Sequence, residues 1–216
     1  MRCSAILPAV LCLILPAVRT RAELVTIELT GEVTFVDESP ILQGLFHIGD
    51  PVTGIYTYDA DMGDKNPWGS VGDYDFNTEP YGVVLDLSGL TIQTDPNNVH
   101  FSIGILNNMN GRDSYGFSSD VNLPLPNGLP VRHISWQLDD WSATALSSDH
   151  LPTEAPVLED WQRAGSLNIE FGFKGGSVIG AGIESATVVP EPSTFCILAV
   201  LSVLTIGRQR ARRYEG

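Results

Sequence analysis

The amino-acid sequence predicts an all-β protein, built as a single antiparallel β-sandwich or jelly-roll-like domain. Apolar and polar residues alternate with period two in several segments, which is typical of half-buried strands. Residues that favour turns separate these segments, and no part of the body carries a sustained helical period of apolar residues. Many short strands with little helix favour a sandwich or a jelly roll over a mixed fold.

The expected strands follow one another along the chain. The clearest runs from Leu24 to Phe35, where apolar residues alternate with threonine and glutamate. A helix of one or two turns is predicted only within Ala155–Ala164, since Leu158 and Trp161 are three residues apart. Alternation also predicts strands over 99–105 and 167–173, and shorter β-rich runs lie at 52–58, 83–92, 114–117, 131–138 and 177–189.

Residues 1–22 are predicted to be a secretory signal peptide. Arg2 supplies a positive start, and Ala5–Val18 is an apolar stretch interrupted by two prolines. Thr20-Arg21-Ala22 then places small residues at the two positions that a signal peptidase recognises, which predicts cleavage near Ala22. The alternative is a permanent anchor, but about 14 apolar residues fall short of the roughly 20 that span a bilayer.

Residues 23–189 form the predicted β domain, which we call the body. Its 24 acidic residues stand against five basic ones, a net charge of −19. Binding to nucleic acid requires clustered Lys and Arg, so this balance argues against nucleic acid as a partner. An acidic body is compatible with extracellular life or with divalent cations. All three cysteines (Cys3, Cys12 and Cys196) lie outside the body, which must therefore fold without a disulfide.

The chain ends in a tail, residues 190–216, with three parts. Pro190-Glu191-Pro192 cannot continue a strand because both prolines lack an amide hydrogen, so this motif is expected to be exposed and extended. The 15 residues Ser193–Gly207 carry no charge, and as a helix they would measure about 22 Å against a hydrocarbon thickness of about 30 Å. A short transmembrane helix beside an accessible hinge suits a temporary tether. The cytoplasmic side is marked by Arg208, Arg210, Arg212 and Arg213.

This order of parts resembles the PEP-CTERM sorting signal of Gram-negative bacteria. In that family an exosortase, a membrane-embedded cysteine protease-like enzyme, recognises the tail and removes the helix near the motif. The resemblance implies that Pro190, Glu191 and Pro192 are recognition residues and that the protein passes through the inner membrane to the cell surface or the extracellular polysaccharide matrix. Gly49–Asp59 and Ala145–Thr153 are also similar to segments of other exported proteins with this tail, but the resemblance implies no activity for the body.

The densest acidic stretch, Asp59–Asn66, is a candidate calcium site. Asp59, Asp61 and Asp64 supply oxygen ligands, of which Ca²⁺ takes six to eight. The spacing does not match an EF-hand, because Asp64 stands where that loop needs glycine. The alternative is a solvated turn, since Asp, Gly and Asn favour turns for backbone reasons.

The sequence contains no catalytic motif that we recognise. It has no Gly-x-Ser-x-Gly, its four histidines are scattered singly without zinc-site spacing, and the body has no cysteine. His100 and His133 lie opposite the larger hydrophobic residues of their strands and are expected on the surface. Ser147–His150 brings Ser, Asp and His together in sequence, whereas catalytic triads are assembled from distant segments.

Aromatic residues offer a candidate sugar-binding site. Trp68 and Trp141 lie in polar segments and are expected to be exposed, where their rings could bind a sugar. Trp136 is in register with Ile134 and Leu138 and is expected in the core. Four tyrosines could extend such a platform or fill the core instead: Tyr56, Tyr58, Tyr74 and Tyr81.

The sequence therefore predicts an exported, non-catalytic component of the cell surface or matrix. The alternative is a carbohydrate-binding or carbohydrate-acting β-sandwich module, and a calcium-dependent structural module is the third hypothesis. An exosortase and the membrane are the expected partners before processing, with extracellular polysaccharide as a further possible partner.

Overall fold

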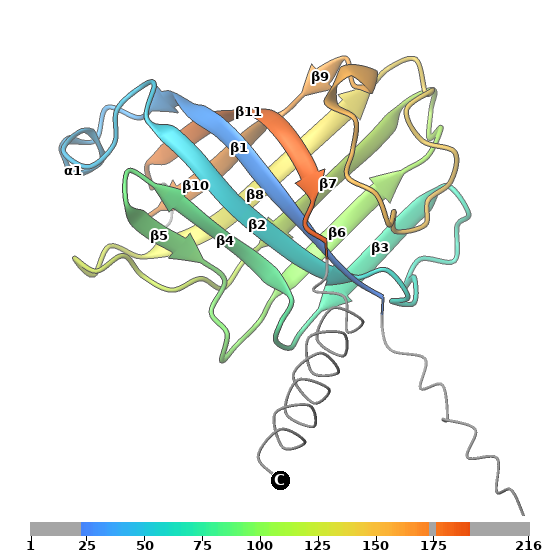
Figure 1. Ribbon diagram of the computed structural model, residues 1–216, viewed down its shortest axis with the longest axis horizontal. Coiled ribbons are helices and arrows are strands. Elements are labelled where there is room, and N and C mark those ends of the chain that lie inside the picture. The colour runs from blue at the N-terminus through green and yellow to red at the C-terminus, as the bar shows by residue number, and fades with distance from the viewer. Residues whose placement is uncertain (1–22, 173–175, 191–216) are drawn as a thin grey trace, which may run out of the picture.

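Figure 1 shows the computed structural model of the protein, which describes residues 23–172 and 176–190. The predicted signal peptide, Glu191, Pro192 and the rest of the tail lie outside these residues. The elements in chain order are β1 (Leu24–Val36), α1 (Pro40–Gln43), β2 (Pro51–Asp59), β3 (Val71–Phe76), β4 (Gly82–Leu87), β5 (Leu90–Gln93), β6 (Phe101–Leu106), β7 (Asp113–Ser119), β8 (Val131–Asp140), the 3₁₀ helix η1 (Leu158–Asp160), β9 (Arg163–Ala164), β10 (Ser166–Phe171) and β11 (Val178–Val188).

The strands form one antiparallel sheet. Ten of them follow the order β3-β6-β7-β8-β10-β11-β1-β2-β4-β5, and β9 pairs with β8. The sheet curls over, so that β1, β2 and β4 lie in front of β6, β7 and β8 in Figure 1. The predicted antiparallel all-β class is confirmed, and the two layers expected of a sandwich are parts of a single continuous sheet.

The core lies between the two halves of the curled sheet. Tyr56 on β2 packs against Phe117 on β7, with ring centroids 4.8 Å apart, and against Trp136 on β8 at 6.2 Å. Trp136 is 1% exposed, which confirms its predicted place in the core. Of the β1 positions predicted to face inward, four are buried, namely Val25, Ile27, Leu29 and Val33. The fifth, Phe35, is 53% exposed, because the pairing of β1 with β11 shifts register between Val33 and Phe35. Burial of apolar surface is the main force that holds such a domain together.

Three local differences from the sequence-based expectation stand out. The run 83–92 is two strands, β4 and β5, joined by a tight turn in which Ser88 and Gly89 take positive φ angles of 53° and 78°. Strand β3 falls where no strand was predicted. Within Ala155–Ala164 the only helical residues are Leu158–Asp160, because the segment packs as a loop against the sheet and continues into β9.

The two ends of the body lie together. Strands β1 and β11 pair antiparallel, so that Ile27 is opposite Val188, and the Val189 amide donates a hydrogen bond to the Thr26 carbonyl at 2.8 Å. The first and last described residues therefore lie at the same end of the domain (Figure 1). Within residues 23–172 and 176–190, no helix has the length and apolar character to cross a membrane.

Candidate functional site

A hollow of about 530 Å³ lies on the solvent side of strands β3, β6, β7 and β8. These strands bury one set of alternating side chains in the core and present the other set to solvent, as in β6, where Phe101, Ile103 and Ile105 are buried. The side chains that face the hollow are short and mostly polar.

The antiparallel register aligns these short side chains in rows across the sheet. One row places Ser102, Ser118, Ser135 and Asn168 side by side on β6, β7, β8 and β10. The hydroxyl groups of Ser102 and Ser118 hydrogen-bond to each other at 2.9 Å. The neighbouring row contains Asp73, Gly104, Gly116 and Gln137 on β3, β6, β7 and β8.

Two further hollows adjoin the first on the same face. One, of about 660 Å³, shares His133 with it, and the other, of about 210 Å³, shares Gln137 and Asn168. The three hollows therefore adjoin one another through these residues, and we call them together the outer groove. Between His133 and Trp141 it follows β8 for about 26 Å, at about 3.3 Å per residue.

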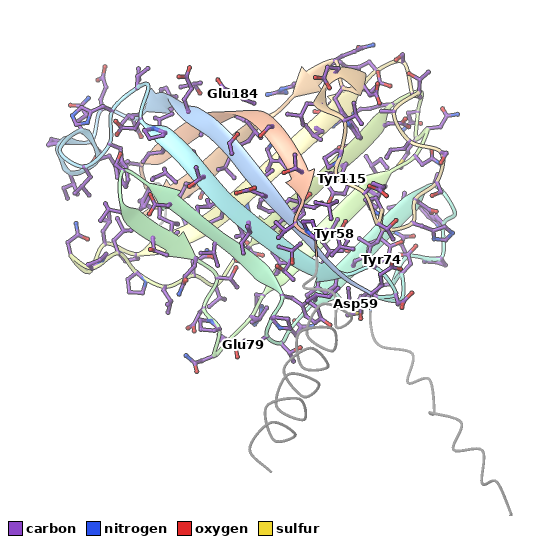
Figure 2. All side chains as sticks on the ribbon, viewed as in Figure 1. Tyr58, Asp59, Tyr74, Glu79, Tyr115 and Glu184 are labelled. Carbon is purple, nitrogen blue, oxygen red and sulfur yellow. The ribbon has the colours of Figure 1, made fainter. Side chains whose placement is uncertain are left out.

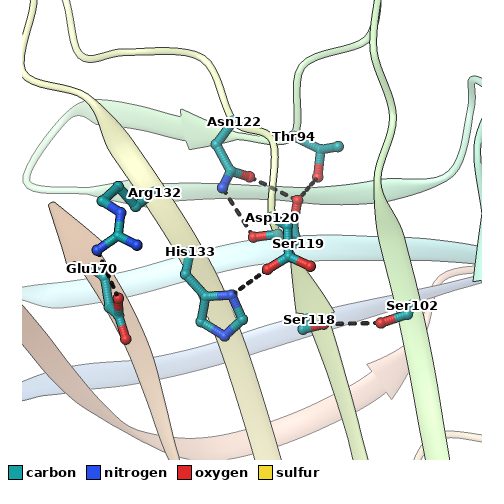
Figure 3. A network of polar contacts seen from close by, with 9 residues as sticks. All are labelled: Thr94, Ser102, Ser118, Ser119, Asp120, Asn122, Arg132, His133 and Glu170. Atoms are coloured by element: carbon teal, nitrogen blue, oxygen red, sulfur yellow. Dashed lines mark hydrogen bonds and ion pairs between the residues drawn. The ribbon is translucent and has the colours of Figure 1, made fainter. Parts of the chain in front are cut away.

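Polar pairs line the His133 end of the outer groove (Figure 3). His133 Nδ1 lies 2.7 Å from the Asp120 carboxylate, and the second ring nitrogen points away from this pair. Arg132 lies 3.8 Å from the Glu170 carboxylate on the adjacent strand. The prediction that His133 is a surface residue is confirmed in part, because its side chain is 30% exposed.

The opposite end of the outer groove is built around an ion pair between Arg112 and Asp139. The side-chain amide of Gln137 donates to Asp139 at 2.9 Å and to the Ser114 hydroxyl at 3.2 Å. Burial raises the pKa of Asp139, but the hydrogen bonds from Gln137 and Arg112 outweigh it, so that the pKa lies below its ordinary value. Asp139 is therefore ionised at neutral pH and holds Arg112 in place.

Both candidate sugar-binding tryptophans are exposed, but they lie in different parts of the surface. Trp141 and Trp68 are 54% and 66% exposed, which confirms that both rings face solvent. Trp141 lines the outer groove beside Arg163, whereas Trp68, in the loop before β3, is not among the residues that line its three hollows. The tyrosine platform is wrong in three of its members, because Tyr56, Tyr58 and Tyr74 are buried in the core.

Two of the three candidate calcium ligands, Asp59 and Asp64, accept hydrogen bonds from main-chain amides. One Asp59 oxygen accepts the Asp61 amide at 3.0 Å, and one Asp64 oxygen accepts the amides of Asn66 and Asp73 at 2.8 and 2.9 Å. Across the described part of the chain, no three acidic, histidine or cysteine side chains gather so that they could hold a metal ion. The geometry is that of a turn stabilised by its own carboxylates.

We expect millimolar calcium to leave the melting temperature of the protein unchanged, because binding would have to displace these amide contacts. Thermal melting with calcium and with a chelator measures this directly. A rise in melting temperature that Asp61→Asn weakens, and Asp86→Asn on β4 does not, would establish the calcium site instead.

Buried tyrosines connect β2 and β3 to the long segment between β8 and η1. Figure 2 labels the two tyrosines, Tyr58 and Tyr74. The Tyr58 hydroxyl donates to the Pro152 carbonyl at 2.6 Å, and the Tyr74 hydroxyl donates to the Asp149 carbonyl at 2.8 Å. Gly49–Asp59 and Ala145–Thr153, the two segments singled out in the sequence, thus meet through Tyr58. Asp149 is buried while His150 is exposed, so these neighbours in sequence do not share one environment.

Comparison of this chain with models of known protein families, with curated proteins and with solved structures finds no match.

Proposed function

We propose that the protein is an exported component of the cell surface or the extracellular polysaccharide matrix. In this proposal an exosortase recognises Pro190, Glu191 and Pro192 and removes the helix that follows. The order of the tail, with a proline-bracketed glutamate, an uncharged stretch and an arginine cluster, carries the proposal. The body then acts by binding rather than by catalysis.

The position of the chain ends supports this assignment. A protein exported by an N-terminal signal and held by a C-terminal helix is attached to the same membrane at both ends. Pairing of β1 with β11 brings those ends together, and Val189 and Pro190 are both exposed. The body can therefore fold outside the membrane while the motif stays accessible to a processing enzyme.

The described sheet ends before the tail begins. Strand β11 ends at Val188, and the Val189 amide bonds to β1. Removal of the residues after Pro190 would therefore take none of the described strands from the sheet. Processing would release the body intact.

Loss of the tail in a host with the cognate exosortase is the expected result. Mass spectrometry of surface material should find few peptides that span Pro192 to Arg208. Changing Pro190, Glu191 and Pro192 to alanine should keep the tail attached and the protein in the membrane fraction. The matched control changes Ser193 and Thr194 to alanine, which leaves the motif intact and should leave processing unchanged. Spanning peptides in most wild-type molecules, or normal release of the triple variant, would contradict the proposal.

A further inference from the structure

We propose that the outer groove is the binding site of a neutral polysaccharide, with the surface around Gly104 as its floor. The proposal goes beyond the proposed function, which assigns a destination and no ligand. It rests on a glycine that packing does not explain, on a comparison between the solvent-facing residues of the two halves of the sheet, and on the distribution of charge.

Gly104 has no structural reason to be glycine among the described residues. It lies in the interior of β6, where glycine weakens a strand, and its φ angle is not in the left-handed region. A Cβ atom built on it would meet no atom within 4 Å, so packing does not require the missing side chain. The side chain would instead enter the outer groove. A glycine of this kind fits a site that a ligand approaches closely.

Gly116, directly opposite on β7, shows the contrast. A Cβ atom there would lie 2.5 Å from the Trp136 carbonyl oxygen, so close packing of the main chain excludes a side chain. The Gly104–Gly116 pair therefore combines one glycine that the fold needs with one that it does not. A substitution at Gly104, unlike one at Gly116, can therefore test binding without disturbing the fold.

Strand β1, in the other half of the curled sheet, serves as an internal comparison. Along β1 the solvent-facing residues are branched or long, alternating between threonine and glutamate from Thr26 to Thr34. Such residues suit a strand with one solvated face. The groove instead carries Gly104 and Gly116 among three serines, Ser102, Ser118 and Ser135. Outward-facing glycines also occur on β11, but a Cβ atom on Gly180 or Gly182 would lie 3.2–3.3 Å from a β1 side chain, so packing bears on those glycines and not on Gly104.

The basic residues of the body gather around the outer groove. Of the four that the structure describes, three line it, namely Arg112, Arg132 and Arg163. The fourth, Lys65, pairs with Asp75 on the outer face of β3. The arginines are balanced by four lining carboxylates: Asp73, Asp120, Asp139 and Glu170. In a body of net charge −19 the groove is thus close to neutral, which favours an uncharged ligand.

The chemistry of the lining narrows the class of ligand. Hydroxyl and amide groups line its middle, so an apolar ligand would leave them unpaired. An extended peptide would pair with an edge strand, whereas this groove lies on the face of the sheet. Two of its arginines are held by carboxylates, which argues against nucleic acid. A neutral polysaccharide offers hydroxyl groups along its whole length and a sugar face for Trp141.

Native gels that contain a polysaccharide test the proposal by the retardation of the protein. The full chain is kept in a detergent without a sugar headgroup, and the probes are dextran, galactomannan and laminarin, with polygalacturonate as the charged comparison. We expect at least one neutral probe to retard the protein and polygalacturonate not to retard it. Gly104→Val should weaken retardation by about tenfold because its side chain fills the floor. Its melting temperature should not fall, because valine suits a strand.

Two matched controls locate the site. A Cβ atom at Gly63 also meets no atom within 4 Å, and Gly63 lies outside the groove, so Gly63→Val should be retarded like the wild type. Trp141→Ala should weaken retardation, whereas Trp68→Ala, which removes an exposed ring outside the groove, should not. If Gly104→Val does not fold, the Trp141→Ala and Trp68→Ala comparison decides. The proposal is overturned if no neutral probe retards the protein, if polygalacturonate retards it equally, or if folded Gly104→Val or Trp141→Ala binds like its control.

Discussion

Unfolding of the body is expected to become steeply more favourable as the pH rises above 10. Burial raises the pKa of Tyr56 and of Tyr115 well above the ordinary value of 10.0. Burial, and then the proximity of Tyr115, raise the pKa of Tyr58 in the same direction. Burial also raises the pKa of Tyr74, to about 12. The folded protein therefore keeps at least four phenolic protons that the unfolded chain releases above pH 10.

The sign and size of the effect follow from proton linkage. Below pH 10 both states hold these protons, and their contribution to stability is fully present. Above pH 10 each proton retained only by the folded state lowers the free energy of unfolding by about 1.4 kcal/mol per pH unit, so four lower it by about 5 kcal/mol per pH unit. Urea unfolding at about pH 9, 10 and 11 measures the slope, and tyrosinate absorbance should appear together with unfolding.

A double variant provides the control for this slope. The hydroxyl groups of Tyr56 and Tyr115 hydrogen-bond to each other at 3.0 Å, so Tyr56→Phe with Tyr115→Phe removes both without leaving either unpaired. Its stability at neutral pH should stay close to the wild type, and its alkaline slope should fall to about one half, because Tyr58 and Tyr74 remain. Either single variant leaves a buried hydroxyl without its partner and should cost about 1–3 kcal/mol. The prediction would be contradicted if the slope for the wild type corresponded to one retained proton or fewer.

The sequence predicts best those strands whose own residues show the alternation. Along most of β1 the inward residues are apolar and the outward ones are Thr or Glu, so the period can be read from this strand alone, although a register shift turns Phe35 outward. In β3, Val-Gly-Asp-Tyr-Asp-Phe, the same alternation is present, but Gly and Asp have low strand propensity. Pairing with β6 overrides that propensity, and such pairing cannot be read from β3 alone. The β4–β5 turn is not evident in the sequence because Ser88-Gly89 lies within a run that is rich in strand-forming residues on both sides.

The outer groove could be predicted only in part. The exposure of Trp141 follows from its polar neighbours. The groove itself combines residues from six strands, and their meeting depends on sheet order and register, which one sequence does not specify. Its floor is also marked by a glycine, which forms no motif. The signal available in the sequence was the group of serines and glycines at solvent-facing positions of β6, β7 and β8, where threonine and charged residues are more typical.

The long segment between β8 and η1 keeps its place through two buried carboxylates. Asp113 and Asp140 are cross-strand partners at the ends of β7 and β8, and both are fully buried. Asp113 accepts the amide of Asn108 at 2.6 Å and that of Leu146 at 2.8 Å. Asp140 accepts the hydroxyl of Ser142 and amides of its own loop, contacts that lower the pKa of Asp140. Asp113 therefore joins this segment to the loop between β6 and β7.

Asp113→Ala is expected to lower the free energy of unfolding by about 3 to 5 kcal/mol, since each of two hydrogen bonds to a charged acceptor contributes about 1.5–3 kcal/mol. Urea unfolding at neutral pH measures the loss. Asp120→Ala is the matched control, because Asp120 follows the other end of β7 and is exposed, and it should cost less than about 1 kcal/mol.

The position of the lost contact also predicts where the native state should loosen. Leu146 precedes Asp149 and Pro152, whose carbonyl groups are held by Tyr74 and Tyr58. Without Asp113 the tyrosines alone hold the segment, and local opening becomes easier than global unfolding. Limited proteolysis of Asp113→Ala should therefore cut first within residues 141–157. A variant that loses less than about 1 kcal/mol and resists cleavage there would show that the tyrosines are sufficient to hold the segment.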